Sequence, residues 1–247
     1  ACFEPSLDYI VCKHPRWDFE KFELVNRKLG VTMKSVGEVM AVGRTFEESL
    51  QKAIRMLDVG KDGLVLNRAN GQKFDVEDIE DHLQHHDDFI LYFVAAALKK
   101  GITVQKIYDL SSIDPWFIEK IKNIVETEEK LKQNELEKPL LREAKKLGFS
   151  DNQIARAKDM KSEEIRKIRK DYNIIPSVKQ IDTLAAEWPA KTNYLYLTYG
   201  GDANDIEINE SDKGVIVLGA GPYRIGSSVE FDWGTVNMVW GLQENGE

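Results

Sequence analysis

The spacing of hydrophobic residues changes along the chain, and the first stretch mixes strand and helix patterns. Residues 8–12 are apolar and β-branched, which predicts a strand that ends before Pro15 because proline cannot extend a ladder. A second strand is predicted over 35–42, where the residues are small or β-branched. A helical pattern follows directly. An α+β arrangement is therefore predicted at the N-terminal end of the chain.

A helix is predicted to begin after Thr45. Thr45 and Glu48 have the spacing of a capping box, in which the threonine oxygen accepts a free amide and the glutamate reaches back. Gly60 suits the C-terminal end of this helix. The apolar residues share one helical face, and they are Phe46, Leu50, Ile54 and Leu57. This face is expected to pack against a core.

From 74 to about 176 the strand pattern nearly disappears, and one helical pattern follows another. The apolar stretch 89–99 predicts a buried helix that Asp88 caps and Gly101 ends. Asp114-Pro115 opens a further helix, because proline at the first helical position loses no hydrogen bond. A mainly α-helical middle domain is therefore predicted.

This helical region resembles itself after a shift of 47 residues, the offset from Gly101 to Gly148. A short helix, a turn and a longer helix are expected in each copy. The shift aligns one pair of capping positions, Thr103 with Ser150, and three pairs of apolar positions: Ile107 with Ile154, Ile113 with Met160, and Ile118 with Ile165. Duplication and chance agreement between two amphipathic patterns both account for the match.

Strand patterns return beyond Pro176. A short helix is predicted over 182–188, and an aromatic and β-branched strand over 193–199. The apolar run 214–219 is typical of a strand buried in a parallel sheet, and a helix is predicted over 229–242. One strand and one helix cannot bury a sheet on both faces. We therefore expect this start of a Rossmann-like α/β unit to need further sequence.

The composition narrows the class of protein. The chain has 247 residues, of which 42% are hydrophobic, and a formal net charge of -8. This apolar fraction allows a packed core, whereas the acidic balance argues against a nucleic-acid binder. The longest apolar run, 89–98, is about half of the roughly 20 residues that a bilayer requires, so no membrane span is expected. Cys2 and Cys12 make no disulfide framework, which favours a reducing, cytoplasmic location.

Five motifs closely resemble the large chain of carbamoyl-phosphate synthetase, in the same order and with the same spacing. They lie at 3–9 (FEPSLDY), 15–17 (PRW), 33–40 (MKSVGEVM), 179–187 (KQIDTLAAE) and 225–232 (IGSSVEFD). The chain resembles the central segment of that large chain.

The resemblance implies a place between two similar synthetase halves, each with an ATP-grasp site. In the family the first half phosphorylates bicarbonate and makes carbamate, and the second phosphorylates carbamate to carbamoyl phosphate. The implied parts are the C-terminal end of an ATP-grasp half (1–59), a helical oligomerisation domain (60–205) and the first βα unit of the second half (206–247). This ligase serves pyrimidine or arginine biosynthesis.

The same resemblance implies the cofactors and partners. ATP with Mg or Mn belongs to the full-length protein, and this segment alone is expected to hold no complete active site, no cofactor and no metal. The expected partners are the remaining large chain, a glutaminase subunit or domain, and a further copy bound through the helical domain. A standalone helical oligomerisation or interaction module without catalysis is the alternative function.

Four residues match positions of the family that line the tunnel for carbamate: Met33, Glu38, Ser228 and Glu230. Glu38 lies in an otherwise apolar and glycine-containing strand. A carboxylate there is expected to be buried or to line a passage, and a buried charge requires partners. The alternative is that both glutamates accept backbone amides at strand–helix junctions. Ser227-Ser228 replaces a glycine-containing pair of many relatives, which changes the expected width of the passage.

Two further motifs have a functional and a simpler structural interpretation. Gly219, Gly221 and Gly226 follow an apolar run, but Ile225 occupies the third glycine position of a dinucleotide motif, so a turn with close backbone packing is favoured over NAD binding. His82 and His86 would share a helical face and could bind a metal, whereas the acidic residues around them favour a solvated loop or cap.

Residues 150–172 resemble a helix-turn-helix with basic residues on the second helix. DNA binding would require these charges to face a groove. Acidic residues lie in the same segment, and the whole chain is acidic, so a salt-bridged, solvated helix face is favoured.

Overall fold

The computed structural model describes residues 7–22, 24–67, 76–181, 194–207, 214–219, 221–222, 224–227 and 229–246, and for 76, 77 and 229–231 the backbone alone. In chain order the elements are β1 (Ile10–Arg16), a 3-10 helix (Phe19–Lys21), β2 (Gly37–Gly43), α1 (Phe46–Met56), α2 (Val76–Gln84), α3 (Ile90–Lys99), α4 (Val104–Ser111), α5 (Pro115–Gln133), α6 (Lys138–Lys146), α7 (Asp151–Lys158), α8 (Ser162–Asp171), β3 (Ser177–Gln180), β4 (Leu195–Thr198) and α9 (Val229–Glu244).

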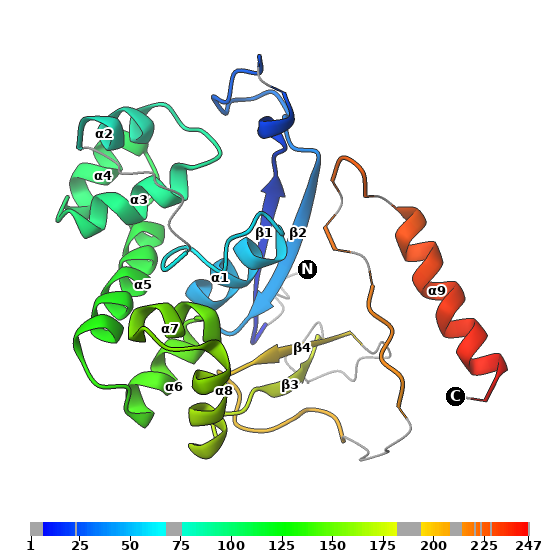
Figure 1. Ribbon diagram of the computed structural model, residues 1–247. Helices are drawn as coiled ribbons and strands as arrows, with labels where there is room; N and C mark the ends of the chain where they lie inside the picture. Colours follow the sequence, from blue (N-terminus) through cyan, green and yellow to red (C-terminus); the bar gives the residue numbers. More distant parts are fainter. Residues whose placement is uncertain are drawn as a thin grey trace, which may run out of the picture.

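The predicted fold class is confirmed. Strands and a helix form the N-terminal end, helices form the middle, and an extended segment leads into a helix at the C-terminal end. Figure 1 shows α2–α8 on one side of β1, β2 and α1, and α9 on the other side.

β1 and β2 form an antiparallel pair, and α1 packs across it. The prediction that β1 ends before Pro15 is wrong, because the strand continues to Arg16 with Pro15 opposite Glu38. Within the described residues this sheet has two strands, so each strand keeps a free edge where a residue without an N–H is tolerated. A small core forms between sheet and helix from Val39, Ala41, Ala53 and Leu57.

Helix α1 begins as predicted, with one difference. The Thr45 hydroxyl accepts the Glu48 amide at 3.1 Å. The Glu48 carboxylate accepts the amide of Arg44 at 2.8 Å, one residue further back than a capping box requires. The helix ends before Gly60, because Asp58 already has a left-handed φ of 53°. The predicted inner face is confirmed, with Phe46 half-buried and Leu50, Ile54 and Leu57 buried.

Helices α2–α8 enclose one hydrophobic core, to which α1 contributes Leu50 and Ile54. α5 is its central element, since it packs against α1, α3, α4, α6 and α7. The described part of the chain between Gly43 and Ser177 contains helices and no strand, as predicted.

Of the caps predicted at Asp114 and Asp88, the first is confirmed and the second is wrong. Asp114 caps α5, its carboxylate accepting a first-turn amide at 2.9 Å. At the start of α3 the N-cap residue is Phe89, which makes no side-chain cap hydrogen bond, and its amide donates to the Asp87 carboxylate at 2.8 Å. Asp88 instead holds the guanidinium of Arg27, with Nε at 2.9 Å.

The repeat of 47 residues exists as a structural repeat. With the preceding helix included in each copy, Gly101 and Gly148 follow α3 and α6 with φ of +78° and +85°. Thr103 and Ser150 then cap α4 and α7, which both have eight residues. The matching isoleucines of both copies are 0% exposed: Ile107, Ile154, Ile118 and Ile165.

The predicted strand over 193–199 is confirmed as β4, which pairs with β3 in antiparallel register, Ser177 opposite Thr198. β3 was not predicted, because its sequence Ser-Val-Lys-Gln carries one strongly apolar residue. The helix predicted over 182–188 lies outside the described residues.

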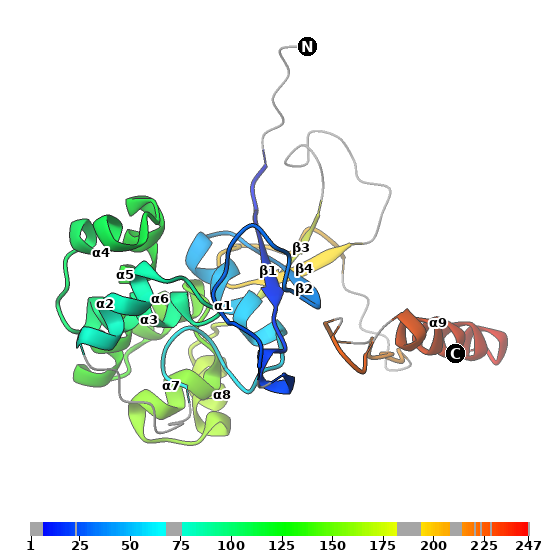
Figure 2. The same cartoon turned by 90° about the horizontal axis from the view of Figure 1, so that it is seen from above.

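The prediction of a strand over 214–219 is wrong for the described chain. This run pairs with no described strand, and Val215, Ile216 and Leu218 are exposed. A strand needs a neighbour for its N–H and C=O groups. The helix predicted next is confirmed as α9. Two views place α9 apart from the other helices (Figures 1 and 2), and it packs closely against no other described helix or strand.

Candidate functional site

Glu38 lies on β2 at the edge of a hollow of about 520 Å³. The other walls come from β2, α1 and the C-terminal segment: Val39, Met40, Met56, Gly221, Pro222 and Asp232. The Glu38 side chain is 55% exposed, and its Oε1 lies 3.0 Å from the Nζ of Lys13 on β1. Of the two expectations for Glu38, burial is therefore wrong. Glu38 instead lines a hollow together with Asp232 in the first turn of α9.

The other three predicted site residues are not all brought to this hollow. Met33 lies in the loop before β2 and is 86% exposed. Ser228 lies outside the described residues, and Glu230 is described by its backbone alone, in the first turn of α9. Asp232, two residues further on, lines the hollow with Glu38. The grouping of all four residues around one passage stays a prediction.

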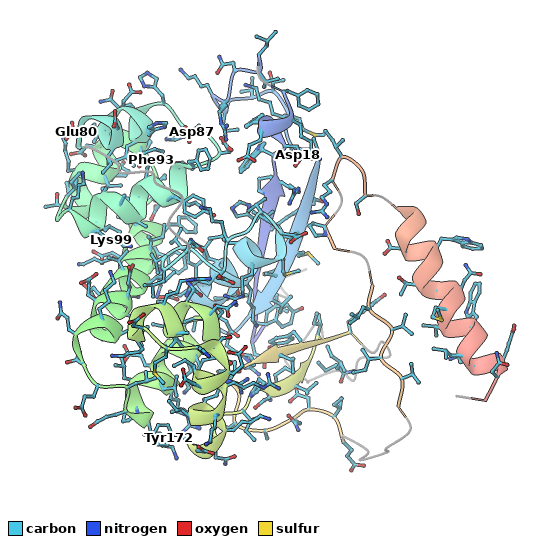
Figure 3. All side chains as sticks on the ribbon, viewed as in Figure 1. Asp18, Glu80, Asp87, Phe93, Lys99 and Tyr172 are labelled. Atoms are coloured by element: carbon cyan, nitrogen blue, oxygen red, sulfur yellow. The ribbon has the colours of Figure 1, made fainter. Side chains whose placement is uncertain are left out.

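The turn 224–227 is held against the N-terminal end of the chain. Its Ile225 amide donates to Oδ2 of Asp18 at 3.2 Å, and its Ile225 carbonyl accepts Nζ of Lys21 at 2.9 Å. The Arg224 guanidinium donates to Asp58, just beyond α1, at 2.8 Å. We call these contacts of Asp18, Lys21 and Asp58 with Arg224 and Ile225 the anchor. Figure 3 shows Asp18 at the end of the sheet that faces the C-terminal segment.

Asp18 is the buried member of the anchor, with 7% of its surface exposed. Nε of Arg16 and Nζ of Lys21 each lie 3.1 Å from its carboxylate. Burial alone would raise its pKa, but hydrogen bonds from Lys21 and the Ile225 amide, with the charge of Arg16, hold the pKa below its usual value. The Asp18 carboxylate is therefore ionised. Its negative charge is compensated by Arg16 and Lys21 from the N-terminal end of the chain and by the Ile225 amide from the C-terminal end.

The anchor was not predicted from sequence. Its one local signal is an aspartate between two aromatic residues, Trp17 and Phe19, next to Arg16. Such a charge is rarely left in an apolar setting without a partner. The partner, however, lies more than 200 residues away in sequence, and no spacing rule finds it.

The polar face of α1 is a second junction. Glu48 is 1% exposed and holds three segments together. Its carboxylate accepts the Arg44 amide before α1 and the Thr198 hydroxyl of β4 at 2.9 Å, and it pairs with Nζ of Lys52 at 2.8 Å. Lys52 in turn donates to the carbonyl of Leu197 on β4. Glu48 and Lys52 thus attach the β3–β4 ribbon to α1.

The same helix face binds the turn between α6 and α7. Gln51 donates to the Leu147 carbonyl at 2.9 Å, and Arg55 donates to the Gly148 carbonyl at 2.9 Å. Gln153 of α7 donates to the Gln51 side chain at 2.8 Å. These contacts of the polar positions were not predicted from sequence, because a buried polar helix face and a solvated one have the same periodicity.

A buried ion-pair network lies between α6, α7 and α8. Nζ of Lys145 is 2.8 Å from Asp151, and Nε of Arg169 is 2.9 Å from the other oxygen of that carboxylate. Burial lowers the pKa of Lys145 to about 8, against the attraction of Asp151. Burial would raise the pKa of Asp151, but the charge and hydrogen bond of Lys145, with the hydrogen bond of Arg169, hold it below its usual value.

This network bears on the helix-turn-helix interpretation. Arg169, one of the basic residues on the second helix, is 7% exposed and bound to Asp151. It therefore supports the packing of α8 rather than facing a groove of DNA.

The histidine cluster has structural partners. Nδ1 of His82 lies 2.6 Å from Asp87, and its ring stacks on Phe93 with 3.8 Å between centroids. Nδ1 of His85 lies 3.0 Å from Asp81. Figure 3 labels Asp87, in the connection between α2 and α3, and Phe93 on α3. Among the described residues, no three histidine, cysteine or acidic side chains are arranged to hold a metal ion.

The glycines near the C-terminal end do not have the role expected of them. A Cβ added at Gly219, Gly221 or Gly226 would meet no described atom within 4 Å, so the predicted close backbone packing is wrong. Glycine is needed at position 226 for a different reason: its φ of +88° is one that other residues rarely adopt. It closes the turn in which Arg224 and Ser227 exchange two backbone hydrogen bonds of 3.0 Å.

Within the described ranges, no helix is long and apolar enough to span a membrane. Cys12 is a free, half-buried thiol, and burial raises its pKa. Cys2 lies outside the described residues.

Comparison with known proteins adds a family to this geometry. The family model for the carbamoyl-phosphate synthetase large chain, oligomerisation domain, matches residues 38–173. The model for the carbamoyl phosphate synthase preATP-grasp domain matches residues 211–247.

Curated relatives match over almost the whole chain. A carbamoyl phosphate synthase large chain of Sulfurisphaera tokodaii is 52% identical over 240 residues, which are 97% of this chain and 23% of that protein. The multifunctional protein URA2 of Saccharomyces cerevisiae is 50% identical over 250 residues, covering 99% of this chain and 11% of that protein. The chain thus spans less than a quarter of the length of these two relatives.

Proposed function

Because the chain belongs to the family of carbamoyl-phosphate synthetase large chains, we propose that it is a segment of the ATP-dependent ligase that makes carbamoyl phosphate. The substrates would be bicarbonate, ammonia or glutamine nitrogen, and ATP, and the product would serve pyrimidine or arginine biosynthesis. The observation that carries this proposal is identity of about half over nearly the whole chain, in both a large chain and a multifunctional protein.

We propose the following division of labour along the chain. Residues 1–59 would complete the first synthetase half, 60–205 would form the oligomerisation domain, and 206–247 would begin the second half. The types of element support this division, since β1, β2 and α1 precede the helical core in sequence. The anchor then joins residues before the helical core to residues that follow it in sequence. In this arrangement the segment spaces the halves, contributes contacts between copies and forms part of the carbamate passage.

A passage has a physical reason to exist here. Carbamate decays in water, so a walled route that excludes bulk solvent preserves it between two sites. The hollow at Glu38 supports this role because elements from both chain ends form its walls. Met33, Glu38, Ser228 and Glu230 are the proposed wall residues of the passage in the complete protein.

We propose that ATP and Mg or Mn bind elsewhere in the complete enzyme, with a glutaminase subunit or domain as the source of nitrogen. Neither family description that matches this chain is that of an ATP-grasp domain itself. The chain alone is then expected to show no bicarbonate-dependent ATP hydrolysis. Turnover above a control without protein would contradict this part of the proposal.

The test of the passage uses Glu38→Ala in the complete synthetase. We expect ATP hydrolysed per carbamoyl phosphate formed to rise, while bicarbonate-dependent ATP hydrolysis and the reverse synthesis of ATP from carbamoyl phosphate are retained. Glu126→Ala on α5 is a matched control, because its side chain is 56% exposed against 55% for Glu38. A parallel fall of both half-reactions with overall synthesis would show that the passage role is wrong.

The standalone interaction module is not favoured. Similarity restricted to the helical middle would suit a separate module, but the matched relatives cover the N-terminal strands and the C-terminal unit as well.

A further inference from the structure

The turn 224–227 is held in place by polar contacts rather than by apolar packing. The N–H and C=O of Ile225 are both engaged by Asp18 and Lys21. The Ile225 side chain is 44% exposed. Polar contacts therefore decide where this turn lies. Asp18 accepts both the Ile225 amide and Lys21, which holds the Ile225 carbonyl, while Arg224 is held separately by Asp58.

Asp18 is itself fixed to the elements that present Glu38. Its neighbour Arg16 lies opposite Gly37, the residue before Glu38 on β2. The guanidinium of Arg16 donates to the Leu57 carbonyl at the end of α1 as well as to Asp18. The carboxylate thus has a rigid connection on one side to the strand and helix that form two walls of the hollow.

On its other side Asp18 holds the segment that supplies the opposite wall. Gly221 and Pro222 line the hollow and precede the anchored turn by a few residues, and Asp232 follows it in α9. α9 packs closely against no other described helix or strand. The width of the hollow between Glu38 and this wall therefore depends on the anchor.

We propose that Asp18 is a positioning residue for the carbamate passage, which sets the distance between the Glu38 wall and the wall formed by Gly221, Pro222 and Asp232 on either side of the anchored turn. The part of this inference that concerns carbamate rests on the proposed function, whereas the contacts of the anchor belong to the chain itself. Asp18 acts through Ile225 and touches no reacting atom. Its loss widens the passage and releases carbamate to solvent without damage to either site of phosphorylation.

The first test measures the anchor in the 247-residue chain by amide hydrogen exchange. Asp18→Ala is expected to speed exchange of the Ile225 amide roughly tenfold, as loss of a hydrogen bond to a charged group predicts. Asp202→Ala, at an exposed loop position, is the control and leaves this rate unchanged. Unchanged exchange at Ile225 in Asp18→Ala would overturn the proposal.

The second test measures coupling in the complete synthetase. Asp18→Ala is expected to raise ATP hydrolysed per carbamoyl phosphate roughly twofold, with both half-reactions retained. Asp18→Asn keeps an acceptor for the Ile225 amide and should fall between Asp18→Ala and the natural protein. Asp18→Ala combined with Glu38→Ala should be no more uncoupled than Glu38→Ala alone, because both act on one passage.

The outcomes separate the inference from the proposed function. If Glu38→Ala uncouples the enzyme and Asp18→Ala does not, the positioning role is wrong and the passage stands. If neither uncouples it, the passage itself is wrong. If Asp18→Ala lowers all reactions in parallel, its role is only structural and the inference is overturned. Should that variant fail to fold, Lys21→Met removes one bond to Ile225, leaves the Asp18–Arg16 pair, and is expected to uncouple more weakly.

Discussion

Two stretches of the helical domain share one local architecture but differ in what lies against them. The first copy comprises α3, α4 and the start of α5, and the second comprises α6, α7 and α8. Their turns, caps and central isoleucines correspond at an offset of 47 residues. The turn of the second copy is packed on α1, where a Cβ at Gly148 would lie 2.8 Å from the Cα of Glu48. At Gly101 of the first copy, no described atom lies within 4 Å of that position.

The difference lies in a few polar substitutions on a shared apolar frame. Leu98, Val104 and Lys106 of the first copy correspond to Lys145, Asp151 and Gln153 of the second. In the second copy these residues form the buried ion pair and the bond to Gln51 of α1. The comparison teaches that the apolar pattern fixes the helices, whereas the polar positions decide which copy joins the N-terminal unit.

The largest expected effect is a difference in stability between alanine variants of Gly148 and Gly101. Gly148→Ala combines a strained positive φ with a clash against the backbone of Glu48, and we expect it to lower the free energy of unfolding by roughly 3 kcal/mol or more. Gly101→Ala carries the φ strain alone, about 1 kcal/mol. Urea denaturation of both variants measures the difference. Equal losses would mean that the α6–α7 turn does not press on α1.

A smaller effect is expected at the ion pair. Asp151→Val leaves Lys145 and Arg169 without their carboxylate and should cost about 2–3 kcal/mol, less than for a fully buried pair because Asp151 is 18% exposed. Lys145→Leu combined with Asp151→Val restores the residue types of the first copy and should recover part of this loss. The unrecovered part reflects Arg169. Urea denaturation of the single and double variants tests this, and a double variant as unstable as the sum of both singles would contradict it.

Local features of the fold could be predicted from the sequence. The caps at Thr103, Asp114 and Ser150, the inner face of α1 and the repeat all depend on residues within one helical turn or on a regular spacing. These interactions need no knowledge of the tertiary fold, which is why pattern alone found them. The cap at Asp88 failed for the opposite reason, because Arg27 binds that carboxylate from 61 residues away.

The candidate site could be predicted less well. The resemblance led to Glu38, but its pairing with Lys13 depends on the antiparallel register of β1 and β2, and its side chain is 55% exposed. The anchor joins residues 207 positions apart, and Glu48 meets Thr198 across 150. Such pairings depend on how separate elements pack. Periodicity describes each element alone and does not contain that information.

Acid pH is expected to destabilise the second copy more than the first. This is the smallest of the three expected effects, after those of the glycine and ion-pair variants. The pKa of Asp151 lies below its unfolded value of 3.8, as does that of Asp62, whose carboxylate binds Asn152 and Arg156 of α7. For both, burial raises the pKa and is outweighed by hydrogen bonds and charges of their partners. Between the folded and unfolded pKa values the unfolded chain binds more protons, so this stabilisation is complete above about pH 4 and is lost as the pH falls through the folded values.

Both of these carboxylates serve the second copy, and the corresponding position to Asp151 in the first copy is the uncharged Val104. We therefore expect the amide protection of Ile154, corrected for intrinsic exchange, to fall before that of Ile107 as the pH is lowered from 5 toward 3. The variant Asp151→Asn has no carboxylate to protonate there, so its protection at Ile154 should start lower and change less over the same range. An equal loss at Ile107 and Ile154 in the natural chain would mean that the helical core opens as one unit, and that the polar positions of the second copy govern docking onto α1 without governing its own stability.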